Sequence, residues 1–504
     1  MNIKQAKEQI RNTLRAYLSR DSLGNYRIPT VRQRPVLLIG PPGIGKTQIM
    51  EQIAAEENVG LVSYTITHHT RQSAIGLPFI EKRNYDGMEH TVTEYTMSEI
   101  LGSVYGLMEK TGLREGILFL DEINCVSETL APMMLQFLQC KTFGNQKLPE
   151  GWLIVAAGNP PEYNRSVRDF DVVTLDRVKR ITVEEDFPVW KEYALRKGLH
   201  GAVISYLDLK KDNFYRIENS PEGMQFATAR GWEDLSEILF AYEALGIAPD
   251  TELAVQYVQM PSIARDFTNY YALYNRYRQV YHIDDILRGQ VPKVTVSEFA
   301  AAPFDEKLAV MGLLLSRLSE AARETRRQDA LTAALHDAAL AARGRLPEPP
   351  EASLREIAAE RRAALRCADQ AGQEDREKKL LRQTEIRRLE EYIGQLDGSL
   401  DSEEQMDALR SLFAGDTALR ERLADGTGRM FDNAFRFLEA AVGPSQELVL
   451  FVSEITAGYD TSWYVGEFGC DAYFRHNRDL LLDMTRQNIL DRLADRNGAE
   501  TPAP

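Results

Sequence analysis

Residues 36–47 read Val36-Leu-Leu-Ile-Gly-Pro-Pro-Gly-Ile-Gly-Lys-Thr47, four apolar residues followed at once by a glycine-rich loop that ends in Lys-Thr. The loop, Gly40–Thr47, fits the pattern G-x-x-x-x-G-K-[ST], and the residues after it, Gln48–Glu56, favour a helix. Glycines let backbone N–H groups turn inward around phosphate oxygens, and the amino terminus of a helix adds positive potential. This strand–loop–helix context predicts a phosphate-binding loop rather than an ordinary glycine-rich turn.

The loop predicts how a nucleoside triphosphate and magnesium are bound. Lys46 places a cation at the β- and γ-phosphates, and the Thr47 hydroxyl is expected to coordinate Mg²⁺. The residues expected to bind the nucleotide in this segment are Gly40, Pro41, Pro42, Gly43, Ile44, Gly45, Lys46, Thr47 and Gln48.

A second apolar run ends in two carboxylates, Ile117-Leu-Phe-Leu-Asp-Glu122. Ligands bind at the carboxyl edge of a parallel sheet, so the two carboxylates at the end of this strand are expected to lie in the binding site. Asp121 is expected to bind the nucleotide's magnesium ion through a water molecule, and Glu122 to accept a proton from the attacking water and align it. Many strands end in acidic turns, but a position about 75 residues after a phosphate loop makes this signal strong.

A third apolar run, Leu153–Ala157, leads into Gly158-Asn159-Pro160. An amide at this strand end can contact both the γ-phosphate and the attacking water, which makes Asn159 a candidate nucleotide sensor. Asparagine before proline is also a common turn pattern, so Asn159 taken alone has a purely structural interpretation as well.

The order of the patterns predicts the fold class. Short apolar runs alternate with helical segments from Pro35 to about Glu185, which suits a parallel sheet between helices. Two interruptions, Gly76–Thr96 and a segment around Phe143, have the composition of β-hairpins. After about Glu185 strand patterns disappear. We therefore expect an α/β P-loop core, then an all-α lid, then an α-helical carboxy-terminal extension.

A chain of 504 residues is long enough for two to four domains. Leu346-Pro-Glu-Pro-Pro predicts a linker or a sharp helix break, and the residues from Ala499 onward are expected to form a frayed tail. The expected parts are an amino-terminal helix (1–30), the nucleotide-binding core (31–185), the helical lid (186–290), a helical connector and linker (291–352), a charged helical segment (353–400) and a carboxy-terminal helical domain (401–504).

Composition narrows the functional classes. The content of 44% hydrophobic and 27% charged residues is that of a globular protein. No stretch reaches the roughly 20 apolar residues of a membrane helix, and the amino terminus lacks the apolar centre of a secretion signal, so we expect a cytoplasmic protein without membrane insertion. The four cysteines lie far apart and are expected to be reduced. The net charge of −15 argues against a large nucleic-acid surface and favours protein partners.

Two features outside the motifs admit more than one interpretation. The aromatic residues Phe267, Tyr270, Tyr274, Tyr277 and Tyr281 recur at helical spacing; a binding surface is conceivable, but a buried helix face is simpler. Cys470 and His476 suggest a metal site, against which two lone ligands are weak evidence.

These motifs, in this order, resemble the AAA+ ATPases and specifically their MoxR-like branch. Gly40–Thr47 is similar to the Walker A motif, Ile117–Glu122 to Walker B and Asn159 to sensor 1. The segment Gly76–Thr96 looks like the helix-2 insert of that branch, and the one near Phe143 like its pre-sensor-1 hairpin. The resemblance covers about Pro35 to Leu245, and the core motifs leave the remainder of the chain unexplained.

The resemblance assigns roles to two arginines. Leu175-Asp-Arg-Val178 is similar to the L-D-R-F segment whose arginine reaches the nucleotide of the neighbouring subunit, which makes Arg177 the candidate finger. Ala227-Thr-Ala-Arg-Gly-Trp232 looks like the A-T-x-R segment of the lid, which makes Arg230 the sensor 2 candidate. Each could instead be a surface ion-pair partner. The nearby arginines that compete with Arg177 are Arg165, Arg168 and Arg180.

The resemblance implies an ATPase that assembles as a ring, with a hexamer expected, and that uses ATP and Mg²⁺ to remodel, mature or activate a client protein. Members of this branch commonly work with a partner that carries a von Willebrand factor A domain, so metal insertion into a client is one implied form of maturation. Two alternatives remain at this point: a nucleic-acid-dependent or restriction-type motor, which shares this core, and a nucleotide-regulated switch with negligible turnover. The preference for ATP over GTP rests on the resemblance alone, and neither client nor ring size follows from the sequence.

Overall fold

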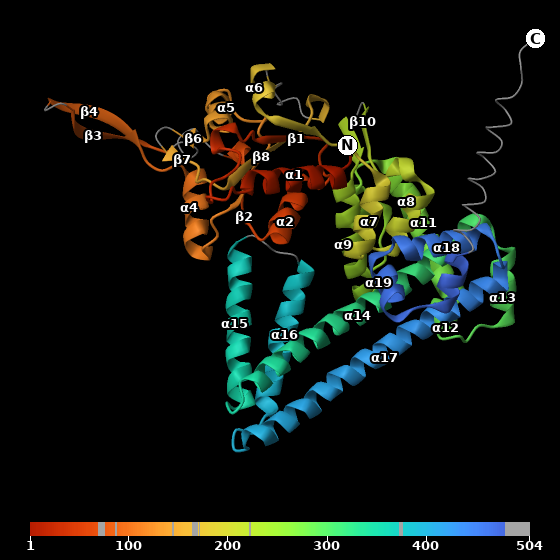
Figure 1. Ribbon diagram of the computed structural model, residues 1–504. Coiled ribbons are helices and arrows are strands. Elements are labelled where there is room, and N and C mark those ends of the chain that lie inside the picture. Colours follow the sequence, from red (N-terminus) through yellow and green to blue (C-terminus); the bar gives the residue numbers. More distant parts are fainter. Residues whose placement is uncertain are drawn as a thin grey trace, which may run out of the picture. The chain divides into compact units, whose positions relative to one another are not determined.

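The computed structural model describes residues 1–68, 76–85, 88–143, 146–163, 170, 172–220, 223–371 and 376–478. They form two compact units (Figure 1). The first comprises Met1–Val189 and Ala352–Gly394, and the second comprises Trp190–Glu351 and Gln395–Pro504. Among the described residues, no helix is long and apolar enough to cross a membrane.

The first unit is built on a five-stranded parallel sheet in the order β2-β5-β8-β1-β9. Because β8 lies between β1 and β5, the loops that follow these three strands meet at one edge of the sheet. This arrangement is the predicted parallel sheet of a P-loop core. The strands are β1 (Val36–Ile39), β2 (Gly60–Thr65), β5 (Gly116–Asp121), β8 (Trp152–Gly158) and β9 (Lys179–Thr182).

Helices cover both faces of this sheet. Leu37 and Leu118 lie in one apolar cluster with α4 (Glu99–Thr111) and α5 (Ala131–Cys140). Their sequence neighbours point to the other face, in a cluster with α1 (Ile3–Leu18) and α2 (Lys46–Glu57). Since both faces are buried, the central strands are continuous apolar runs, which is the pattern seen in the sequence.

Smaller elements surround the sheet. Both predicted β-hairpins are present: β3 (Pro78–Tyr85) pairs with β4 (Met88–Tyr95), and β6 (Thr142–Phe143) with β7 (Gln146–Lys147). The short helix α6 (Val172–Arg177) precedes β9.

Two helices from later in the chain belong mainly to the first unit. They are α15 (Pro350–Gln370) and α16 (Arg376–Gln395), and they contact each other through ion pairs such as Arg361–Glu385. The carbonyl of Ala371 at the end of this segment accepts a hydrogen bond of 3.2 Å from the Leu61 amide of β2. The predicted break at 346–350 separates α15 from α14.

The second unit is mostly helical, as predicted for the region after the core. Its helices are α7 (Phe187–Lys197, from Trp190), α8 (Gly201–Leu209), α9 (Ala229–Leu245), α10 (Thr251–Tyr257), α11 (Pro261–Tyr281), α12 (Ile283–Leu287), α13 (Lys293–Ala301), α14 (Phe304–Gly344), α17 (Ser402–Val442), α18 (Gln446–Ala457) and α19 (Tyr459–Phe468). The predicted tail from Ala499 lies outside the described residues.

The expectation that no strand follows Glu185 is wrong. β10 (Arg216–Ser220) and β11 (Gly223–Ala227) form an antiparallel hairpin. Most of its side chains are exposed or half-buried, so neither strand carries the apolar run that signals a buried strand. The hairpin is held by backbone pairing between the two strands, which the pattern of apolar residues in the sequence does not predict.

The aromatic residues of α11 form a buried helix face. Phe267, Tyr274 and Tyr281 are each no more than 3% exposed. The ring of Phe267 packs edge-on against Tyr206 and Trp232. The interpretation of this stripe as core is confirmed for these three residues, whereas Tyr270 and Tyr277 are half-buried.

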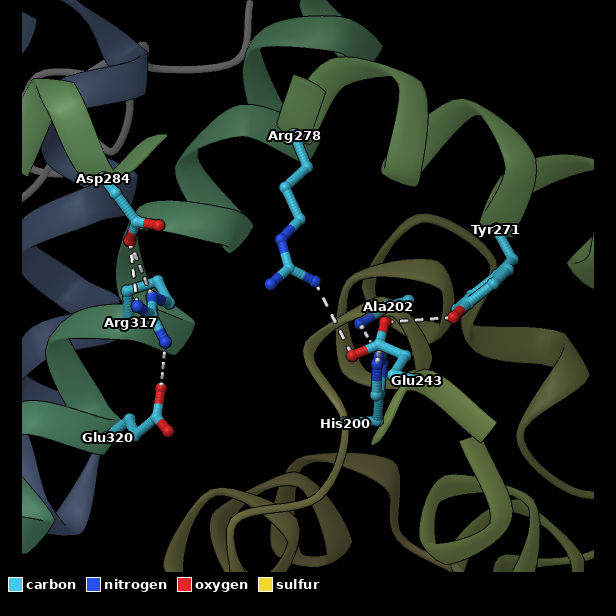
Figure 2. Close-up of polar contacts among 8 residues, drawn as sticks. All are labelled: His200, Ala202, Glu243, Tyr271, Arg278, Asp284, Arg317 and Glu320. Carbon is cyan, nitrogen blue, oxygen red and sulfur yellow. Dashed lines mark hydrogen bonds and ion pairs between the residues drawn. The ribbon is translucent and has the colours of Figure 1, made fainter. Parts of the chain in front are cut away.

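A polar cluster joins α8, α9 and α11 (Figure 2). Glu243 accepts a hydrogen bond of 3.0 Å from the Tyr271 hydroxyl, and one of its carboxylate oxygens lies 3.2 Å from His200 Nε2. The hydrogen bond to His200, with a further contribution from Arg278, lowers the pKa of Glu243 to about 2. His200 Nδ1 in turn accepts from the Ala202 amide and so caps α8.

A buried lysine lies at the end of α5. Lys141 is 6% exposed, and its ammonium has Gln33 Oε1 at 3.5 Å. Burial lowers the pKa of Lys141 from 10.5 to about 8. Since a buried charge with so little compensation is unfavourable, this position should weaken the fold at neutral pH.

We predict that Lys141→Met raises the free energy of unfolding at pH 7 by roughly 1–3 kcal/mol, because the apolar chain of similar length carries no charge to bury. The pKa is lower in the folded than in the unfolded state, so the unfolded chain binds more protons between pH 8 and 10.5 and wild-type stability rises across that window. The advantage of the variant should therefore shrink over the same window in urea unfolding. The exposed Lys147→Met is the control, and an advantage independent of pH would contradict the prediction.

Candidate nucleotide-binding site

The phosphate-binding loop joins β1 to α2 with backbone geometry that requires glycine. Gly43 and Gly45 have φ values of 74° and 90°, in the left-handed region that other residues rarely adopt. Helix α2 begins directly after the second of them, at Lys46. The amino terminus of α2 thus lies at the loop, where the N–H groups of its first turn suit an anion.

Lys46 connects the loop to the end of β8. Its side chain is 8% exposed, and Nζ donates to the carbonyls of Gly40 and Pro41, both at 2.8 Å. Nζ also donates to Asn159 Oδ1 at 2.7 Å. The cation and the candidate sensor amide are therefore in direct contact.

Thr47 and Asp121 face each other at the same edge of the sheet. Thr47 Oγ1 lies 3.4 Å from Asp121 Oδ2, while the other carboxylate oxygen accepts from the Glu122 amide at 2.9 Å. A hydroxyl and a carboxylate supply the hard oxygen donors that Mg²⁺ prefers. The residues present thus fit the ion expected from the sequence.

Glu122 adopts an unusual backbone conformation, with φ of 57°. Its carboxylate oxygen Oε2 accepts a hydrogen bond of 2.9 Å from Thr67 Oγ1. Thr67 belongs to a 3-10 turn, Ile66–His68, that follows β2, the strand paired with β5. Thr67 was not predicted from the sequence, where it is only a hydroxyl residue after an apolar run. Its contact with Glu122 depends on the pairing of β2 with β5, which the sequence pattern does not give.

Asn124 is a second residue that sequence reasoning missed. Its Nδ2 donates to the backbone carbonyl of Asn159 at 2.7 Å, so it links the acidic turn to the sensor. Close by, burial raises the pKa of the Cys125 thiol, and the carboxylates of Glu122 and Asp121 add to the effect. The site therefore keeps Cys125 in its neutral form at physiological pH.

The candidate finger arginine lies on the surface of the first unit. Arg177 is exposed at the end of α6, and its guanidinium donates to Gln139 Oε1 of α5. Val178, which stands where the family pattern has phenylalanine, is buried. Among the competitors, Arg180 is exposed on β9, whereas Arg165 and Arg168 lie outside the described residues. Within the described residues, Arg177 makes no hydrogen bond or ion pair with the phosphate-binding loop of its own chain.

The sensor 2 candidate belongs to the second unit. Arg230 is exposed in the first turn of α9. Thr228 caps this helix by accepting a hydrogen bond of 3.2 Å from the Gly231 amide, which gives the Ala-Thr-Ala-Arg sequence a local structural reason.

Comparison with a family model supports the nature of this core. Residues 35–178 match the AAA domain of the dynein-related subfamily. Together with the strand order and the loop, this match makes the core a P-loop domain of the AAA+ ATPase type, for which nucleotide binding is implied. No curated protein matches the chain.

Solved structures with related folds share little sequence with the chain. A candidate ATPase from Cytophaga hutchinsonii is 16% identical with a TM-score of 0.23, over 36% of this chain and 46% of that one. Two single-residue variants of Thermotoga maritima RuvB are each 15% identical, with TM-scores of 0.28 and 0.26. The matches cover 51% and 45% of this chain and 69% and 62% of the RuvB chains. The chain spans about half the length of the Cytophaga protein. At this level of similarity the matches carry no information on substrate or partners.

Proposed function

We propose that this chain hydrolyses ATP with Mg²⁺ as a ring-forming, MoxR-like AAA+ ATPase that remodels or matures a client protein. One observation carries the proposal: Lys46 and Thr47 lie within hydrogen-bonding reach of Asn159 and Asp121, from three strands that end at one edge. A cation, a hydroxyl, a carboxylate and an amide are the groups that phosphoryl transfer to water requires.

In the proposed mechanism, each group has its own task. Thr47 and Asp121 would hold Mg²⁺, Asp121 through water, and the ion would neutralise charge that develops on the phosphates. Lys46 would leave its own loop carbonyls to contact the β- and γ-phosphates. Glu122 would leave Thr67 to align the attacking water and take its proton, while Asn159 would contact the γ-phosphate.

Ring assembly follows from the proposed role of Arg177. A guanidinium that is always charged and forked suits the equatorial oxygens of the transferring phosphoryl group. Its exposure at the end of α6 is compatible with serving the nucleotide of a neighbouring subunit. Arg230, as sensor 2, would add a second positive charge when the lid closes over the nucleotide.

The client is proposed to be a protein, with a von Willebrand factor A domain partner as the first candidate. The β3–β4 hairpin supports protein contact because large apolar side chains are exposed on it: Phe79 is 46%, Met88 70% and Ile80 75% exposed. Exposed apolar side chains in such a group are typical of interaction surfaces. Insertion of metal into the client is a further part of this proposal.

Lys46 and Glu122 should separate binding from chemistry. Lys46→Ala is expected to weaken ATP binding, because the phosphates lose their buried cation. Glu122→Gln should bind ATP as tightly as the wild type and lose about 10²–10⁴-fold in kcat, because the water loses its base. Fluorescent-nucleotide titration and phosphate release measure the two effects. The exposed Lys110→Ala and Glu128→Gln are the charge-matched controls, and equal loss of binding in both site variants would contradict this division of roles.

Arg177→Ala should remove the activity that depends on assembly, with a loss of about 10³–10⁵-fold if it is the finger. Mixing this variant with Glu122→Gln should restore turnover at one of the two kinds of mixed interface. There the nucleotide site of the Arg177→Ala subunit has an intact Glu122 and faces the intact Arg177 of its Glu122→Gln neighbour. Phosphate release across mixing ratios measures the restoration. If mixing restores nothing while Arg180→Ala mixtures do, the finger is Arg180.

The Glu122→Gln protein is also expected to retain its client when ATP is bound. Affinity purification with ATP and Mg²⁺ should enrich the same protein that Lys46→Ala fails to enrich, identified by mass spectrometry. DNA captured in place of a protein, together with DNA-stimulated hydrolysis that falls with salt, would instead support the nucleic-acid motor.

A further inference from the structure

The acidic turn after β5 is joined to the end of β8 by one buried side chain. Asn124 is 5% exposed, and its Nδ2 donates to the Asn159 carbonyl at 2.7 Å. The neighbouring Ile123 amide donates to the Ala157 carbonyl at 2.9 Å. Two hydrogen bonds thus connect the turn that carries Glu122 to the strand end that carries Asn159.

Gly158 makes room for this side chain. A Cβ atom at Gly158 would lie 2.5 Å from Asn124 Oδ1, 2.8 Å from its Cγ and 3.0 Å from its Nδ2. These three atoms are the nearest neighbours of that position, and all belong to Asn124. The space beside the Asn159 peptide is therefore filled by the Asn124 amide group, and even the smallest side chain at residue 158 would displace it.

The Asn124 amide is not explained by stability. Its Oδ1 is buried and, within the described part of the chain, has no hydrogen-bond partner. A buried acceptor left without a partner is unfavourable by at least as much as one hydrogen bond stabilises, so the Nδ2 bond brings no net gain in stability. Leucine, which has nearly the same shape, would fill the space without an unpaired Oδ1, although it would leave the Asn159 carbonyl without this donor. What only the amide supplies is a donor aimed at the Asn159 carbonyl.

We infer that Asn124 is a positioning residue for the candidate sensor Asn159. By holding the carbonyl of residue 159 it fixes the peptide plane there, and with it the direction in which the Asn159 side chain leaves the backbone. The Asn159 side chain accepts a hydrogen bond of 2.7 Å from Lys46 Nζ. The hydrogen bond from Asn124 to the Asn159 carbonyl therefore also affects the position of the side chain that is proposed to contact the γ-phosphate. The inference rests on the proposed role of Asn159 in nucleotide hydrolysis.

Asn124→Leu tests the inference. It should lower kcat about 10–100-fold, since a misplaced group of this kind costs up to about 10²-fold, while KM changes by less than about 3-fold. It should also reduce the preference for ATP over ADP in equilibrium binding, because Asn159 would no longer be held toward the γ-phosphate. The melting temperature should change little, because leucine removes the unpaired Oδ1 together with the donor to the Asn159 carbonyl, so the loss of kcat cannot be attributed to unfolding.

Gln33→Leu is the matched control. Gln33 is a buried amide, 4% exposed, whose Nε2 donates to the carbonyls of Tyr17 and Ile28 far from the acidic turn in sequence. Its loss should lower the melting temperature and leave kcat and the ATP preference unchanged.

Gly158→Ala provides a second, independent variant. It should expel the Asn124 side chain and reproduce the kcat defect of Asn124→Leu. In an Asn124→Ala background the added methyl group meets no amide, so Gly158→Ala should then have little further effect, and the double-mutant cycle should be strongly non-additive. Additive losses would overturn the inference, as would wild-type kcat in Asn124→Leu.

Failure of the inference is distinguishable from failure of the proposed function. If Glu122→Gln abolishes hydrolysis but Asn124→Leu keeps full kcat and full ATP preference, only the positioning role is overturned. If the wild type binds ATP without turnover, equilibrium binding still tests the positioning role. A preference for ATP over ADP that is lower in Asn124→Leu than in the wild type supports the role, and an equal preference overturns it. If the wild type binds no ATP, both are overturned.

Discussion

The position of β8 between β1 and β5 is the constraint on which the site depends. Neighbouring strands lie about 4.8 Å apart, so the phosphate loop and the acidic turn start roughly 10 Å from each other. A gap of this width would accommodate a phosphate group with its metal ion, and Asn159 directly follows the strand that lies between the two. Lys46 reaches the gap from one side and Glu122 belongs to the other. If β1 and β5 were direct neighbours, the Asn159 amide could not lie between Lys46 and the carboxylates of Asp121 and Glu122.

The two acidic residues are held in different ways, although they are adjacent. Asp121 ends a buried strand, and its carboxylate is held by Thr47 and by the Glu122 amide. Glu122 has a left-handed backbone, which costs a non-glycine residue roughly 1–2 kcal/mol. The Cys125 amide donates to the Glu122 carbonyl at 2.9 Å, which helps to hold this turn. Strain of this kind is maintained when the surroundings over-determine the conformation.

The sequence predicted the core well because its signals are local. A phosphate loop must follow a strand and precede a helix, and buried parallel strands are apolar runs, so β1, β5 and β8 could be placed by reading alone. The places of Thr67 and Asn124 in the site could not be predicted, since they depend on contacts with residues that follow neighbouring strands, and no sequence motif marks these contacts. The β10–β11 hairpin was missed because few of its side chains are buried. That residues 352–394 belong to the first unit could not be predicted either. The composition of this segment predicts helices, but it does not indicate which unit the helices pack in.

The carboxy-terminal helices are part of the fold of the second unit rather than an appendage to it. Lys191 of α7 lies 2.7 Å from Asp208 of α8 and 2.6 Å from Glu454 of α18. Asp460 of α19, with a side chain only 1% exposed, accepts from Arg323 and Arg326 of α14 at 2.9 and 2.8 Å. Removing one partner of such a buried pair leaves an uncompensated charge and costs about 3–5 kcal/mol. Helices joined in this way separate only at high cost. Any movement of α7 and α8 should therefore carry α18 and α19 with it.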